Sequence, residues 1–174
     1  CKGVPAGDQQ RLHDGELCVA GAWDDMVRLS AMVKRLGKKL EDIHVTLDSH
    51  QPLHIAHPIW YRDSKGNLPD PFTVMRAENG SIIGSKFDAN GKQTDVGEFR
   101  AFTPSSHKWT LEYLDKLAAA KRYPHVIWPM HCLIGTVGAA VVEPFFEALM
   151  GWQLLHGNKV VGYVTKGSNP FVEH

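Results

Sequence analysis

The sequence predicts an α/β protein in which short parallel strands alternate with helices. Two observations predict this class. Three short apolar segments rich in β-branched residues are typical of buried strands, and segments with helical periodicity stand between and before them. Helices that connect parallel strands cover the faces of the sheet. The chain has 174 residues, which is enough for one domain with a hydrophobic core.

The first predicted elements are a helix and a strand. Met26, Leu29 and Val33 are spaced by three and four residues, so they share one face of a helix that we expect over residues 22–36. Residues 43–47 (IHVTL) are short, β-branched and mostly apolar, which is typical of a buried strand.

Residues 63–106 interrupt this pattern. They are rich in Gly, Pro, Asn and Asp and lack sustained periodicity, so we expect a long excursion with one or two short strands, such as residues 81–83. We therefore predict a single, incomplete domain over residues 1–174 with a long insertion at about 61–106. Such an insertion would form a lid or reshape a pocket.

Regular structure is expected again after the excursion. We predict a helix over residues 109–122, a strand over 126–128 that ends at Pro129, a helix over 139–155 and a strand over 160–164. This order favours βαβ units.

Bulk composition excludes some classes of partner. Lys plus Arg equals Asp plus Glu, 19 against 19, so nothing predicts binding to nucleic acid or to an anionic membrane. No apolar run is long enough to span a membrane. Cys1, Cys18 and Cys132 are an odd number of cysteines at scattered positions, which does not indicate a disulfide framework and favours a reducing, cytoplasmic location. Whether the chain forms a homo-oligomer stays open.

Polar side chains capable of chemistry follow each predicted strand. They are Asp48-Ser49-His50, the segment 128–131, and Thr165-Lys166. Ligands of open α/β sheets bind beyond the carboxyl ends of the strands, so we expect these groups to meet at one crevice.

Several of these side chains are candidate metal ligands. Asp48 and His50 would point to the same face of a continuing strand, and a carboxylate with an imidazole suits zinc, manganese or iron. His131 would add a third ligand. His54 and His57 lie near enough in sequence to add a fourth or to orient the others. Taken alone, an Asp-x-His pair is more often a solvated turn.

Lys166 follows an apolar strand. A partly desolvated lysine near a metal has a lowered pKa or stabilises developing negative charge, although a lysine in this position is more often simply on the surface.

Taken together and in order, the motifs resemble those of the nicotinamidase and isochorismatase-type cysteine hydrolases. WPMHCLIGTVGAAV (128–141) resembles the WPxHCxxGTxGA signature of that family, and TLDSH (46–50) resembles TxDxH. Three further segments are similar to family motifs: HIA (54–56), GELCVAGA (15–22) and TKG (165–167).

The resemblance implies a three-layer α/β/α sandwich with a mostly parallel sheet. It also implies a divalent metal ion, with zinc favoured over manganese or iron, and a metal site made of Asp48, His50, His131 and His54. Lys166 matches the lysine of an Asp–Lys–Cys triad, whereas Cys132 matches the residue beside a metal ligand and not the nucleophile.

Two other family residues have no match in the sequence. Cys1 resembles the cysteine that follows the catalytic aspartate, and Asp8 is in the wrong place to replace that aspartate. The nucleophilic cysteine would come after His174. We therefore expect that the first strand and the C-terminal strands of the fold are missing and that this chain alone is inactive.

The implied reaction is hydrolysis of nicotinamide or a similar small amide to an acid and ammonia through an acyl-enzyme. Trp60, Trp128 or Phe72 would stack on a planar substrate, although large aromatic residues are core residues by default. Two alternatives stay open: an isochorismatase-like or N-carbamoyl hydrolase, and a non-catalytic fragment that binds metal.

Overall fold

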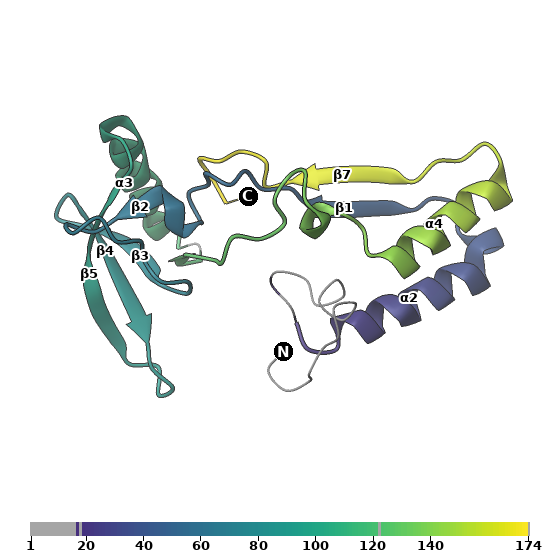
Figure 1. The fold of residues 1–174 in the computed structure, drawn as a ribbon, viewed down its shortest axis with the longest axis horizontal. Helices are drawn as coiled ribbons and strands as arrows, with labels where there is room; N and C mark the ends of the chain where they lie inside the picture. The colour runs from purple at the N-terminus through teal and green to yellow at the C-terminus, as the bar shows by residue number, and fades with distance from the viewer. Residues whose placement is uncertain (1–16, 18, 122, 174) are drawn as a thin grey trace. The chain divides into compact units, whose positions relative to one another are not determined.

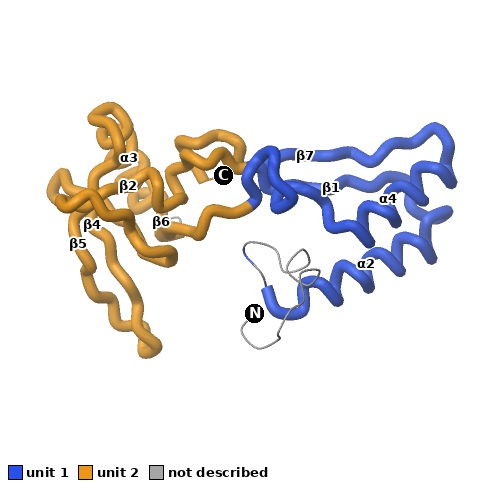
Figure 2. The backbone as a smooth tube through the Cα atoms, in the orientation of Figure 1, with its two compact units in different colours: residues 1–49, 132–166 blue, residues 50–131, 167–174 orange. Residues whose placement is uncertain are grey.

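The structure is a computed structural model that describes residues 17, 19–121 and 123–173. Contacts divide the chain into two compact units (Figure 2). Unit 1 contains residues 1–49 and 132–166, and unit 2 contains residues 50–131 and 167–174. The prediction of one incomplete domain stays a prediction. Cys1, Asp8, Cys18 and the start of the GELCVAGA segment lie outside the described residues.

Unit 1 combines two helices with two parallel strands among its described residues (Figure 1). The strands pair from His44 opposite Gly162 to Asp48 opposite Lys166. The elements of this unit are α2 (Ala22–Leu36), η1 (Gly37–Lys39), β1 (His44–Asp48), η3 (Val137–Ala139), α4 (Glu143–His156) and β7 (Gly162–Lys166).

The core of unit 1 lies between the helices and the strands. Its buried residues are Val33, Ala148, Leu149, Trp152 and Val161. The predicted helix over 22–36 is confirmed with the same bounds. Acidic residues in its first turn and basic residues in its last turn complement the helix dipole.

Unit 2 is built on an antiparallel sheet. Its described strands lie in the order β2-β5-β4-β3-β6, and α3 packs against β3 and β5. The elements are η2 (Pro58–Trp60), β2 (Tyr61–Arg62), β3 (Val74–Glu78), β4 (Ser81–Phe87), β5 (Gln93–Ala101), α3 (Pro104–Ala119) and β6 (His125–Val126). The fully buried side chains Trp60, Ile82 and Ile127 belong to its core.

The prediction of a three-layer α/β/α sandwich with a mostly parallel sheet is wrong for the described chain. Only β1 and β7 are parallel there, and the larger sheet is antiparallel. The physical reason is that the segment expected to be an excursion forms strands joined by tight turns. Asn79-Gly80 connects β3 to β4 with both residues at positive φ, 51° and 79°. Two-residue turns of this kind join antiparallel neighbours, whereas parallel strands need a longer crossover.

The remaining elements were predicted with shifted bounds. α3 begins at Pro104, five residues before the predicted start, because the Thr103 hydroxyl accepts a hydrogen bond from the Ser106 amide at 3.1 Å and proline suits the first turn. α4 begins at Glu143 and not at residue 139, and Gly157 ends it in a left-handed conformation. The strand predicted at 126–128 is only His125–Val126, antiparallel to β3.

Among the described residues, no helix has both the length and the apolar character that crossing a membrane requires.

Candidate metal centre and lysine site

Four histidines form a cluster within unit 2, and we call them the histidine cluster. The His50 ring centroid lies 4.9 Å from that of His54, 4.9 Å from that of His131 and 5.8 Å from that of His57. His57 lies 5.2 Å from His54 and 5.7 Å from His131. His54 and His57 are fully buried, and His50 and His131 are nearly so.

A backbone hydrogen bond joins the two sequence segments of the cluster. The Trp128 amide donates to the Ala56 carbonyl at 2.8 Å, which holds the segment leading to His131 beside residues 54–57. Ile55 anchors this segment in the core of unit 2. The expected meeting of His50 with His131 therefore occurs, but parallel strands are not its cause, since β6 belongs to the antiparallel sheet.

The hydrogen bonds of the rings define which nitrogen carries the proton. The Nδ1 atom lies 2.9 Å from the Gly167 carbonyl oxygen in His50, 3.1 Å from that of Pro52 in His57, and 2.7 Å from that of Pro129 in His131. A carbonyl oxygen only accepts, so each Nδ1 donates, and each neutral ring keeps its lone pair on Nε2.

His54 is the opposite case. Its Nδ1 accepts a hydrogen bond from the Ala56 amide at 3.1 Å, so a neutral His54 ring carries its proton on Nε2. The Nε2 atoms of both His54 and His57 are buried and have no hydrogen-bond partner. A buried polar atom without a partner is costly, which makes these two atoms candidates for contact with a bound ligand.

Burial keeps these two rings neutral at pH 7. Desolvation, followed by the effect of His50 and His57, lowers the pKa of His54 to about 4. Desolvation also lowers the pKa of His57 below its ordinary value. Neutral imidazole is the form that binds metal ions.

The donor set of the cluster fits a divalent first-row metal, because such ions prefer imidazole nitrogen. Zinc needs its nitrogen ligands at about 2.0–2.1 Å. In the part of the chain that the structure describes, no three His, Cys, Asp or Glu side chains already surround a point closely enough to hold an ion. An ion would therefore have to draw the free ring nitrogens closer to one point.

The other two predicted site residues lie together in unit 1. Asp48 and Lys166 are register partners at the ends of β1 and β7, and the Lys166 ammonium donates to an Asp48 carboxylate oxygen. The Lys166 side chain is 51% exposed, so it is an accessible, ion-paired lysine and not a desolvated one. The pair places a cation and a carboxylate at one end of the parallel strands.

The predicted stacking residues have different environments. The ring of Trp60 is fully buried in the core of unit 2, and its Nε1 donates to the Thr110 hydroxyl at 2.9 Å. It would have to leave the core to stack on a substrate. Trp128 is half-buried, donates to Glu173 at 2.7 Å and meets the exposed ring of Phe72 edge to face.

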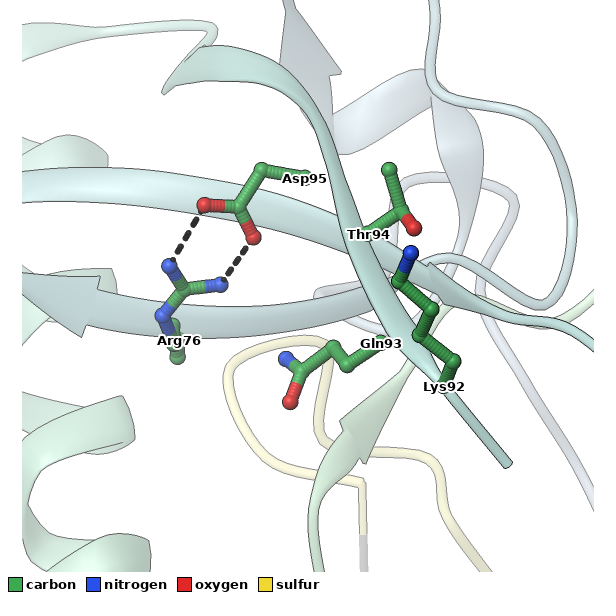
Figure 3. A pocket seen from close by; sticks show the side chains of 5 residues that line it. All are labelled: Arg76, Lys92, Gln93, Thr94 and Asp95. Atoms are coloured by element: carbon green, nitrogen blue, oxygen red, sulfur yellow. Dashed lines mark hydrogen bonds and ion pairs between the residues drawn. The ribbon is translucent and has the colours of Figure 1, made fainter. Parts of the chain in front are cut away.

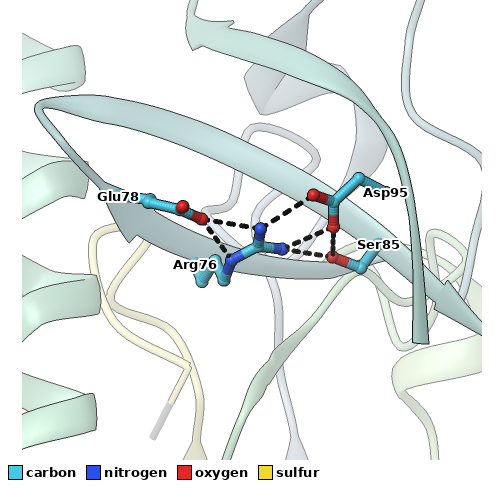
Figure 4. A network of polar contacts seen from close by, with 4 residues as sticks. All are labelled: Arg76, Glu78, Ser85 and Asp95. Atoms are coloured by element: carbon cyan, nitrogen blue, oxygen red, sulfur yellow. Dashed lines mark hydrogen bonds and ion pairs between the residues drawn. The ribbon is translucent and has the colours of Figure 1, made fainter. Parts of the chain in front are cut away.

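Unit 2 also has a shallow pocket on its sheet (Figure 3). It is lined by Arg76, Lys92, Gln93, Thr94 and Asp95. The Arg76 guanidinium donates to both oxygens of Asp95, at 2.8 and 2.9 Å, and also bonds Glu78 and Ser85 (Figure 4). The bonds that Asp95 accepts from Arg76 and from the Ser85 hydroxyl lower the pKa of Asp95 to about 2. The charge of Arg76 is thus already neutralised, so this pocket is a weaker candidate for a functional site than the histidine cluster.

The importance of two residues was not evident from the sequence. His57 was expected only to supplement the site, yet it is one of the four clustered rings. His125 was not singled out, although it is buried and its Nε2 lies within hydrogen-bond distance of the Tyr61 hydroxyl and the Ile55 carbonyl. No motif marks His125; its position next to a short apolar strand was the available signal.

Comparison with solved structures finds a nicotinamidase. The structure of the yeast nicotinamidase Pnc1p, and that of the same enzyme bound to the inhibitor nicotinaldehyde, match this chain with 16% sequence identity and a TM-score of 0.49. The match covers 92% of this chain and 52% of Pnc1p, so the chain spans about half the length of that enzyme. No protein-family model and no curated protein sequence matches the chain.

Proposed function

We propose that this chain is the metal-binding part of a nicotinamidase-like cysteine amidohydrolase, which converts nicotinamide or a similar small amide to the acid and ammonia. The observation that supports this most is the histidine cluster. Three of its four members are the histidines of the TLDSH, HIA and WPMHC motifs, and two members, His54 and His57, have buried Nε2 atoms without partners. The two unpartnered Nε2 atoms are costly to bury unless they bind something.

His50 and His131 would hold a divalent metal ion, and the TLDSH motif adds Asp48 to the predicted ligands. Zinc is the first choice, with manganese and iron as alternatives. When bound, such an ion supplies a Lewis acid that orients a heteroaromatic nitrogen or polarises a water molecule.

Lys166 would act as the lysine of the hydrolytic triad. Its side chain is half-exposed and paired with Asp48, so it is accessible to a substrate or a thiolate. In the proposed reaction an aspartate accepts the proton of a cysteine thiol, and the thiolate attacks the amide carbonyl. The aspartic acid returns this proton to the amide nitrogen, which leaves as ammonia as the thioester forms, and water then releases the acid from the thioester. Lys166 would stabilise the negative charge that develops during the attack.

The test measures ammonia release from nicotinamide together with the metal content of the same sample. It uses this chain and a chain extended by its natural flanking sequence. We expect about one metal ion per chain in both, with turnover in the extended chain. Lys166→Met should lower the turnover of the extended chain by about 100-fold or more.

Lys159→Met is the matched control, because Lys159 is also in unit 1 and is also paired with a carboxylate, that of Glu41 at 2.8 Å. It should leave turnover unchanged. Metal binding without turnover of any small amide would favour the non-catalytic alternative. Turnover without metal would favour an isochorismatase-like or N-carbamoyl hydrolase.

A further inference from the structure

The four rings of the histidine cluster are not equivalent. His50, His57 and His131 each donate Nδ1–H to a backbone carbonyl, whereas His54 accepts from a backbone amide. Metal-binding histidines typically donate the proton of one nitrogen to a carbonyl or carboxylate and bind the ion through the other. Three rings of the cluster follow this rule, and His54 does not.

His57 has the burial, position and hydrogen bonding that a metal ligand requires. It is fully buried, and its ring lies 5.8 Å from that of His50 and 5.7 Å from that of His131. Its Nε2 has no partner, while Nδ1 is held by the Pro52 carbonyl at 3.1 Å. Binding through Nε2 would therefore keep the existing hydrogen bond and satisfy the orphaned atom.

His54 would lose a hydrogen bond if it bound an ion. For Nε2 to offer a lone pair in a neutral ring, the proton must move to Nδ1, where it would face the Ala56 N–H at 3.1 Å. Two donors would then oppose each other in a buried place, which disfavours ligation by His54 roughly tenfold or more.

We propose that His57 is the third imidazole ligand, acting through Nε2 together with His50 and His131, and that His54 is a hydrogen-bond donor beside the ion. This inference rests on the proposed function only in that a divalent ion enters the histidine cluster. It departs from the motif-based assignment, which gives the role to His54. The donor Nε2–H of His54 suits an anionic or lone-pair group bound next to the ion.

A matched pair of substitutions tests the assignment. In His57→Asn, the new amide N–H₂ can still donate to the Pro52 carbonyl, and in His54→Asn the new carbonyl oxygen can still accept from the Ala56 amide. Each variant thus keeps a partner for the backbone group that faces Nδ1 and removes Nε2 with the outer part of the ring. The full chain and both variants are titrated with Co²⁺ while its visible absorption is recorded, and circular dichroism monitors the fold.

We expect His57→Asn to lower the Co²⁺ affinity by about 100-fold or more and to change the absorption bands, because it removes a ligand. His54→Asn should stay within or below the 10–100-fold loss typical of residues that only support a ligand. The reverse order of the two variants would overturn the inference, and so would a folded, unsubstituted chain that binds no Co²⁺.

A second measurement uses the unsubstituted chain and does not depend on the folding of either variant. Long-range ¹⁵N–¹H spectra of the histidine rings, recorded with Zn²⁺, should show His57 protonated on Nδ1 and metal-bound on Nε2, and His54 protonated on Nε2. A metal-bound His54 Nε2 would overturn the inference. Metal binding through His57 without ammonia release by the extended chain would overturn the proposed function alone.

Discussion

Replacing Gly167 by alanine is expected to displace His50 and weaken the histidine cluster. Gly167 has a φ of +71°, which L residues rarely adopt. A Cβ atom at this position would lie 2.5 Å from Cε1 and 2.8 Å from Nδ1 of His50. The carbonyl oxygen that accepts the His50 Nδ1–H also belongs to Gly167. One added methyl group therefore acts on both the position and the orientation of this ring.

The expected magnitude has two parts. The left-handed backbone of an alanine costs about 1–2 kcal/mol, and overpacking against the ring costs about 1–3 kcal/mol. The free energy of unfolding of unit 2 should therefore fall by about 2–5 kcal/mol. If His50 is a ligand, Co²⁺ affinity should fall by about 10–100-fold, the range for a ligand that loses its orienting partner.

Gly66→Ala is the matched control for this prediction. Gly66 also belongs to unit 2 and has a φ of +86°, but a Cβ atom there would meet nothing within 4 Å. It should show only the backbone cost of about 1–2 kcal/mol and unchanged Co²⁺ binding. Urea unfolding followed by circular dichroism and a Co²⁺ titration measure both quantities. Equal losses in the two variants, with equal Co²⁺ affinity, would refute the reasoning.

Three further predictions concern the scaffold. Asp95 should titrate in the folded chain with a pKa of about 2, so its contribution to stability is present above the ordinary carboxyl pKa and is lost as the pH falls through about 2. In ¹³C NMR titrations, Arg76→Gln should return the midpoint of Asp95 toward about 3.9. An unchanged midpoint would contradict this. Leu149→Ala should destabilise unit 1 by about 2–5 kcal/mol in urea unfolding, because the side chain is fully buried. Thr103→Ala should cost about 1 kcal/mol through loss of the α3 cap, and Thr103→Ser should restore most of it.

Local sequence patterns predicted those helices and strands that are marked by residues close together in the sequence. The helix over 22–36 follows from apolar spacing on one face and from charges that suit its ends. The strands near 43–47 and 160–164 follow from short β-branched runs and differ from the observed strands by one or two residues. These elements needed no knowledge of their partners in space.

The antiparallel sheet of unit 2 could not be recognised from apolar alternation. Most of β5 is exposed on both faces, so its sequence lacks the period-two pattern that marks a half-buried strand. The turn at Asn79-Gly80 was the available signal, since this dipeptide favours the two-residue turn of a hairpin. Without that signal the segment was interpreted as an excursion, and the parallel-sheet prediction followed.

The motifs named three of the four residues of the histidine cluster, but they could not say which nitrogen of each ring is available. That property depends on the backbone groups opposite each Nδ1: the carbonyls of Pro52, Pro129 and Gly167 for three rings, and the Ala56 amide for His54. For His50 this property depends on tertiary structure, because Gly167 is 117 residues away, whereas the other three backbone groups lie within five residues of their rings. Substitutions that move these backbone groups should therefore change metal binding even when every histidine is kept. Gly167→Ala is such a substitution, since it leaves all four imidazoles in the sequence and alters only the support of one.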